Sequence, residues 1–200
     1  MQTLLQRKTT EVEVNPFTIW QELFDQFFDL RPNLSDLALP DKSGYIWPIV
    51  SLPEISTNRL WSVVGECFPS TSSYGDDLEA KVTKNDRFYS FRQESCIIAV
   101  RPNIEADEDQ KSKSADQIKQ EDLATLTLYE RMLLEFFHWF RTGGENGGQH
   151  LDRENWSLCS GSRDSDGNVP CAYWDGDEFR VDWDFSDSAN SIMRARLAAL

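Results

Sequence analysis

Residues 171–185 read CAYWDGDEFRVDWDF, and this stretch decides the fold of the C-terminal half. Apolar and polar side chains alternate along two runs that flank Asp175-Gly176-Asp177-Glu178, which is the pattern of a β-hairpin with a tight turn. Successive side chains of a strand point to opposite sides, so one face of the hairpin is predicted to enter the core. That face carries Ala172, Trp174, Phe179, Val181, Trp183 and Phe185.

The opposite face of this hairpin is chemically mixed and is predicted to point outward. It carries Cys171, Tyr173, Asp175, Arg180, Asp182 and Asp184. Truncating Trp174 or Trp183 to Ala is therefore expected to destabilise the fold by about 3 to 5 kcal/mol, and to abolish binding only through unfolding. Replacing Tyr173, Asp182 or Asp184 is expected to leave stability nearly unchanged and to alter recognition of a ligand.

A helix is predicted N-terminal to the hairpin, over residues 127–140. Thr127 and Glu130 have the spacing of a capping box, and Gly143-Gly144 supplies a stop. The helix presents one apolar face, formed by Tyr129, Met132, Leu133, Phe136, Phe137 and Phe140. His138 is expected to be a packed histidine and not a ligand.

Further strands are predicted at residues 156–160 and 193–200, and the charged stretch 103–122 is expected to be a surface helix or a connector. In the N-terminal half, residues 16–30 form an amphipathic helix whose aromatic stripe belongs to the core or to a subunit contact. Residues 43–68 are predicted as strands and loops, 70–77 as an exposed turn, and 95–100 as a buried strand.

The bulk composition excludes several classes of partner. Acids outnumber bases 34 to 20, giving a formal net charge of −14, so neither nucleic acid nor an anionic membrane is expected as a partner. The first ten residues lack the apolar region of a secretory signal, and no later stretch is apolar enough to cross a bilayer, which favours a cytoplasmic location. Cys67, Cys96, Cys159 and Cys171 lack metal-ligand spacing and are expected to be idle thiols in a reducing compartment; a Cys159–Cys171 disulfide stays open for a secreted protein.

Four ordered blocks carry a resemblance to a known family. They are EADEDQKSKSA (residues 105–115), TLYERMLLEFFHWFRTG (127–143), HLDRENWSLCSGSRDSDGNVP (150–170) and MRARLAA (193–199). Together they resemble the variable target proteins of diversity-generating retroelements. The resemblance implies a C-type lectin fold that displays diversified side chains, produced when a mutagenic reverse transcriptase rewrites adenines in the gene.

The residue types in this region agree with that implication. Randomising the adenines of AAC-like codons yields Asn, Asp, Ser, Tyr, Ala or Cys, among others, but not Lys, Gln, Glu, Met or Trp. Trp174 and Trp183 lie outside the set that such codons permit. The predicted ligand-binding positions all lie within it: Asp164, Asn168, Cys171, Tyr173, Asp175, Asp182, Asp184, Asp187, Ser188, Ala189, Asn190 and Ser191.

Catalytic and metal-dependent functions are not expected. The run DSDGN (residues 164–168) departs from an EF-hand loop, because Gly167 precedes Asn168 and no flanking helix pair is evident. The acidic residues near Asp182 are more typical of a solvated face than of a glycosidase pair, and Cys159 and Cys171 lack a catalytic flanking motif. We therefore expect neither a catalytic centre nor a cofactor nor a metal.

The sequence thus predicts an α+β protein with two segments. Residues 104–200 form a C-type-lectin-like variable module that binds a protein or another macromolecule. Residues 1–103 form an N-terminal helix and a β-rich extension that enlarges the sheet or mediates homo-oligomer formation. The alternative is an acidic interaction protein with one fixed protein partner and no variation.

Overall fold

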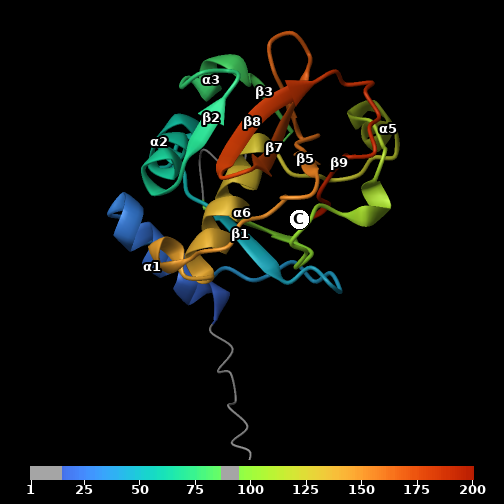
Figure 1. Ribbon diagram of the computed structural model, residues 1–200. Coiled ribbons are helices and arrows are strands. Elements are labelled where there is room, and N and C mark those ends of the chain that lie inside the picture. Colours follow the sequence, from blue (N-terminus) through green and yellow to red (C-terminus); the bar gives the residue numbers. More distant parts are fainter. Residues whose placement is uncertain (1–14, 87–94) are drawn as a thin grey trace, which may run out of the picture.

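The central element of the fold is helix α6 (Leu128–Arg141), as seen in a computed structural model that describes residues 15–86 and 95–200 (Figure 1). Its capping box is confirmed: the Thr127 hydroxyl accepts the Glu130 N–H at 3.2 Å, and the Glu130 carboxylate accepts the Thr127 N–H at 2.8 Å. Leu128 and every residue from Glu130 to Trp139 are buried. The prediction of a single apolar face is therefore incomplete, because α6 is covered almost all round.

One sheet lies against α6 and combines strands from the N-terminal half with the last strand of the chain. Its order is β1 (Trp47–Ser51), β4 (Cys96–Val100), β10 (Ala198–Ala199), and both pairings are antiparallel. The buried strand predicted at residues 95–100 is confirmed as β4, the middle strand of this sheet.

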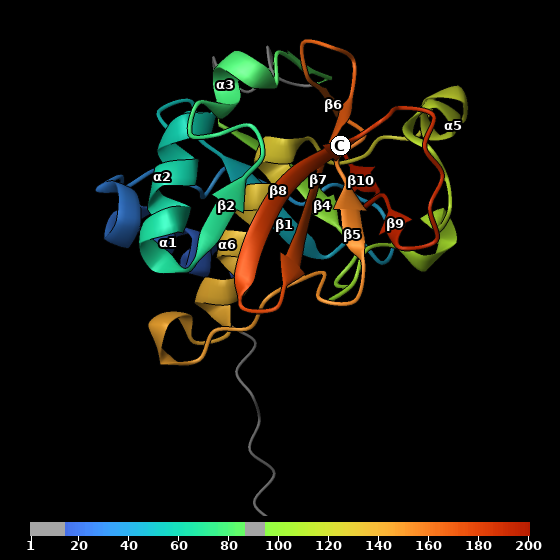
Figure 2. The same ribbon diagram turned by 45° about the horizontal axis from the view of Figure 1, so that its top comes forward.

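A second sheet packs against α6 through β7 and has the order β2-β8-β7-β5-β9 in the described chain (Figure 2). Its strands are β2 (Ser70–Ser72), β5 (Trp156–Leu158), β7 (Val169–Asp175), β8 (Glu178–Asp184) and β9 (Met193–Arg194). The β2–β8 and β5–β9 pairings are parallel and the other two are antiparallel, so the sheet is mixed. The strands β3 (Lys84–Asn85) and β6 (Ser162–Arg163) form a separate short antiparallel pair.

Three predicted elements are wrong or incomplete. Residues 57–67 form helix α2 (Thr57–Cys67) instead of a strand, because Ser56 caps its first turn and Leu60, Trp61 and Val64 share a buried face. Part of the predicted turn at 70–77 is strand β2, which needs β8 as its partner. The single strand predicted at 193–200 is split into β9 and β10, which belong to different sheets.

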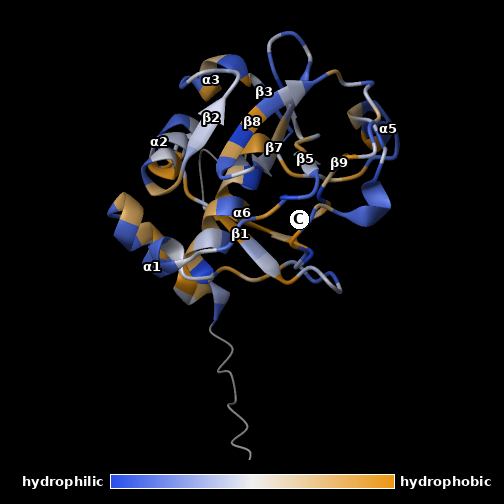
Figure 3. Cartoon of the chain, viewed as in Figure 1, coloured by the Kyte–Doolittle hydropathy of each residue, from blue (hydrophilic) through white to orange (hydrophobic). Residues whose placement is uncertain are grey.

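The N-terminal helix is confirmed as α1 (Pro16–Phe28), around which hydrophobic and hydrophilic residues alternate (Figure 3). Its aromatic stripe is used inside the chain: Trp20 stacks on Phe137 of α6 with ring centroids 4.8 Å apart. The helix ends where Asp29 adopts a left-handed φ of +52°. The other helices are α3 (Leu78–Lys81), η1 (Glu108–Gln110), α5 (Ala115–Gln120) and η2 (Gly144–Asn146).

Both predicted segments contribute to one hydrophobic core, which runs from Trp20 on α1 to Ala198 on β10. Strand β2 adds to the edge of the sheet that contains the hairpin, and β10 adds to the edge of the sheet formed by β1 and β4. The predicted division at residue 103 is thus not a gap between two cores. The mixed α+β class is confirmed.

Candidate ligand-binding surface

The C-terminal hairpin is formed by β7 and β8 as predicted. The two strands pair antiparallel from Val169 opposite Asp184 to Asp175 opposite Glu178. Gly176 takes a φ of +63° in the two-residue loop, a conformation that glycine adopts without a steric penalty. On the other side of β8, β2 covers only Phe179 to Val181, so β8 extends beyond its neighbour.

The core side of the hairpin is confirmed near the turn. Ala172, Trp174, Phe179 and Val181 are all buried and belong to the main core. Trp174 donates its indole N–H to a Glu135 carboxylate oxygen of α6 at 2.8 Å, so its polar atom is satisfied inside the protein.

The same side is exposed at the far end of β8, and the prediction that Trp183 and Phe185 are core residues is wrong. Trp183 is 41% exposed and Phe185 is 61% exposed. Their rings pack edge to face with centroids 5.7 Å apart. The strand alternation continues through these residues, but α2 and α6 cover only the part of β8 near the turn.

The opposite side of the hairpin is partly covered, so Cys171 and Tyr173 are not the outward residues that were predicted. Cys171 is fully buried in a second apolar cluster with Ala115 and Ile118 of α5, and burial raises the pKa of its thiol. Tyr173 is 5% exposed and stacks on Trp156, with ring centroids 4.2 Å apart. All four cysteines are free thiols.

Asp164 is also buried, because it anchors its own loop. One carboxylate oxygen accepts the N–H groups of Asp166 and Asn168 at 2.9 and 2.8 Å. The other accepts the Tyr74 hydroxyl at 3.3 Å and the Asn168 amide at 3.1 Å. These bonds fix the loop 164–168 against the segment after β2, so Asp164 orders the loop and is not presented to a ligand.

The remaining predicted positions are accessible and gather mainly at one end of the sheet. Because Val169 pairs with Asp184, Asn168 lies beside the end of β8. The segment 185–192 then runs from β8 past α5 to β9, fixed where Ser186 bonds Asp116 (Figure 2). Asp175 lies apart, at the hairpin turn. The exposed positions are Asp175, Asp187, Ala189, Asn190 and Ser191, and the half-buried ones are Asn168, Asp182, Asp184 and Ser188.

A hollow of about 400 Å³ borders the exposed aromatic residues. It is lined by Ser73, Tyr74, Gly75, Lys81, Asp164, Ser165, Asp166, Asn168 and Trp183. The sequence pattern missed it, because β2 and α3 approach this end of β8 only in the folded chain. Together, the accessible positions at this end of the sheet, Trp183, Phe185 and the hollow are called the β8 surface below.

A buried network of charges supports the hairpin from beneath. Arg131 bonds Asp152 at 2.9 Å and Glu135 at 2.9 Å, and Arg196 bonds Asp152 at 2.6 Å; all four side chains are at most 2% exposed. Burial by itself raises the pKa of Glu135 and of Asp152, but attraction to the arginines, together with hydrogen bonds from neighbouring side chains, outweighs it and leaves the pKa of both carboxylates below its ordinary value. The network is charge-balanced and closed to solvent, which suits a structural role better than catalysis.

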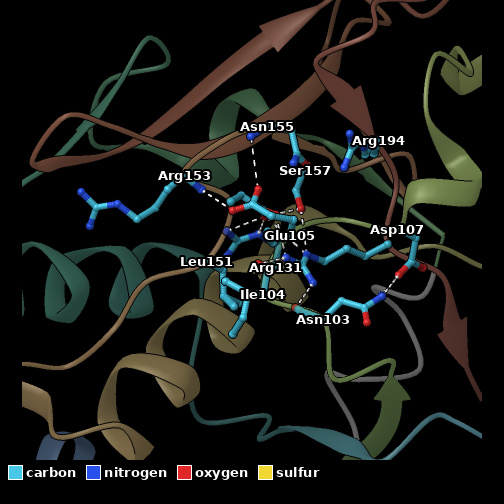
Figure 4. A network of polar contacts seen from close by, with 12 residues as sticks. Asn103, Ile104, Glu105, Asp107, Arg131, Leu151, Arg153, Asn155, Ser157 and Arg194 are labelled. Carbon is cyan, nitrogen blue, oxygen red and sulfur yellow. Dashed lines mark hydrogen bonds and ion pairs between the residues drawn. The ribbon is translucent and has the colours of Figure 1, made fainter.

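Three of the four blocks that carry the family resemblance contribute side chains to this network, and the fourth is tied to two of them by bonds to backbone N–H groups (Figure 4). Block 127–143 contributes Arg131 and Glu135, and block 150–170 contributes Asp152 and Ser157. From block 193–199, Arg196 donates to the carbonyl oxygens of Asn103 and Ile104. In block 105–115, Glu105 accepts the N–H groups of Arg153 and Asn155, both at 3.2 Å. Asp107 accepts the Leu197 N–H at 2.8 Å.

Residues 15–86 and 95–200 contain neither a candidate metal centre nor a candidate membrane-spanning helix. No group of three or more His, Cys, Asp and Glu side chains in these ranges is arranged to hold a metal ion. Within the same ranges, no helix combines the length and the apolar character needed to span a membrane.

Comparison with known proteins adds no relative: no family model, no curated protein and no solved structure matches the chain.

Proposed function

We propose that this chain is a ligand-binding protein that presents a diversified surface on a C-type lectin scaffold, as the product of a diversity-generating retroelement. The observation that carries the proposal is the buried charge network. Four blocks separated in sequence resemble the family. Three of them contribute charged side chains to the buried network beneath the hairpin, and Glu105 and Asp107 of the fourth accept backbone N–H groups of the last two blocks. Such a scaffold holds its shape while surface residues change.

The β8 surface suits this role because its side chains divide into two kinds. Trp183 cannot arise from an AAC-like codon, and we assign it as a fixed contact at the centre. Short side chains that such codons permit lie beside it: Asn168 lines the same hollow, and Asp184 follows it in β8. Asp187 and Asn190 are exposed on the segment after β8. The accessible positions contact the ligand in this proposal. Asp164, Cys171 and Tyr173 are buried and support the surface from within.

The genetic test is direct. A neighbouring reverse-transcriptase gene and a near-copy template that differs at adenines are expected. The codons for Asn168, Asp182, Asp184 and Asn190 are expected to be AAC-like or products of adenine substitution in such codons. Other codons at these positions would contradict the proposal.

A binding test needs no knowledge of the natural ligand. The full chain is displayed with random residues at Asn168, Asp182, Asp184 and 187–191, and binders to a chosen protein target are selected. The control library varies four exposed positions on α1: Thr18, Gln21, Glu22 and Asp25. The β8 library is expected to yield folded binders well above the control, and equal yields would argue against this surface.

A second function is favoured by the charge of the chain. Acidic residues outnumber basic ones 34 to 20, which suits an interaction protein with one fixed basic partner. The two functions are separated by the genetic test, because a fixed partner requires neither a template copy nor adenine-derived codons.

A further inference from the structure

The hollow beside Trp183 has the features of a pocket for a single side chain. Its walls come from four segments: the turn after β2, the end of α3, the loop 164–168 and Trp183 of β8. The walls are held together by the Tyr74–Asp164 bond and by the Ser165 N–H, which donates to the Lys81 carbonyl at 3.1 Å. The hollow is therefore built by contacts within the protein and does not depend on a ligand for its shape.

The electrostatics of the hollow favour a positively charged occupant. Asp166 presents an exposed carboxylate at its rim, and the buried Asp164, although its oxygens are bonded within the loop, adds negative charge behind the wall. Lys81 is the cation that opposes them within the lining. The chain as a whole carries a formal charge of −14, so the approach of a cation is favoured at long range.

The aromatic residues favour a macromolecular partner over a free ion. Trp183 lines the hollow. Among the aromatic side chains, tryptophan attracts cations most strongly through the face of its ring. Phe185 packs against it and extends the apolar area outside the hollow. A small cation would leave that area uncovered, whereas a protein segment would bury it, and exposed tryptophans of this kind are common at the centres of protein interfaces.

We infer that the hollow beside Trp183 binds a lysine or arginine side chain of a protein partner, whose neighbouring residues cover Phe185. The inference rests on the proposed function, because it names the partner chemistry of the same surface. Trp183 and Asp166 are the two residues expected to recognise the cation.

A random dodecapeptide library displayed on phage tests this inference with the full chain as target. Enriched peptides are expected to contain lysine or arginine next to an apolar residue.

The affinity of a synthetic enriched peptide for the chain should fall about tenfold in the variant Trp183→Ala and by a smaller factor in Asp166→Asn. Replacing its basic residue with norleucine should cause a similar loss, and Lys81→Gln should strengthen binding by removing the opposing cation. Asp25→Asn on α1 is the matched control for loss of a surface carboxylate, and it should leave the affinity for the peptide unchanged.

Either of two results would overturn the inference: no enrichment of basic residues, or affinity that is unchanged in Trp183→Ala. A thermal melt of Trp183→Ala shows whether the variant is folded, and Asp166→Asn gives an independent reading if it is not. If the β8 library still yields binders while the peptides lack basic residues, the proposed function stands and only the partner class is wrong.

Discussion

The two ends of β8 follow one alternation and have opposite fates. Near the turn, Phe179 and Val181 are at most 1% exposed, whereas Trp183, on the same side of the strand, is 41% exposed, and Phe185, which directly follows the strand, is 61% exposed. The difference lies in what covers them: Trp61 of α2 and Trp174 pack on Phe179, but among the described residues no helix covers Phe185. The alternation of a strand determines the face of the sheet to which each side chain points. Whether that side chain is buried depends on how far the neighbouring elements extend over that face.

The largest expected effect is at the covered end, in Trp174→Ala. We expect a loss of about 5 kcal/mol in the free energy of unfolding, near the upper end for a large buried aromatic, because the indole bond to Glu135 is also lost. Urea denaturation measures it. A loss below about 1 kcal/mol would show that this end of the hairpin is not part of the core.

The charge network beneath the hairpin gives the next effect. Arg131→Met removes one cation and leaves Glu135 and Asp152 under-compensated, and we expect a loss of about 4 kcal/mol. The pKa values of both carboxylates are depressed in the folded state, so their stabilisation is present above the unfolded values of about 4 and is lost as the pH falls. The difference in the free energy of unfolding between wild type and Arg131→Met should therefore become smaller below about pH 4. A difference that does not change with pH would contradict the assigned pairing.

His138 gives a smaller effect with its own pH window. Burial, together with the nearby Arg141, lowers the pKa of His138 to about 4, and the ring packs against Trp47 with centroids 5.3 Å apart. The unfolded chain takes up a proton near pH 6.5 and the folded chain does not, so stability should fall by about 2–3 kcal/mol between pH 6.5 and pH 4. His138→Phe is expected to remove that slope. Denaturation curves at pH 7, 5.5 and 4.5 compare the two proteins, and parallel pH profiles would contradict the prediction.

The smallest effect is expected at the uncovered end. Trp183→Ala should change the free energy of unfolding by about 1 kcal/mol or less, because the ring is largely exposed and lies outside the main core. The same urea titration as for Trp174→Ala gives the matched comparison. A loss near 3 kcal/mol would mean that Trp183 is covered in solution, for example by a second copy of the chain.

Local patterns were sufficient for the elements whose signals are contained in a few adjacent residues. The capping box at Thr127 and Glu130 fixed the start of α6, and the alternation around Gly176 predicted the β7–β8 hairpin. In both cases the interacting groups are close in sequence, so the chain itself specifies the geometry.

The tertiary structure decided the features that depend on distant partners. Residues 57–67 form a helix because Leu60, Trp61 and Val64 bury one face in the core, although the short apolar run interrupted by Gly65 suggested strands and loops. Cys171 and Tyr173 are buried because α5 and Trp156 cover them, and Trp183 is exposed because the helices pack only on the part of β8 near the turn. The charge network joins residues up to 93 positions apart, and no local pattern reveals such pairings, since burial and charge compensation arise only when the segments meet.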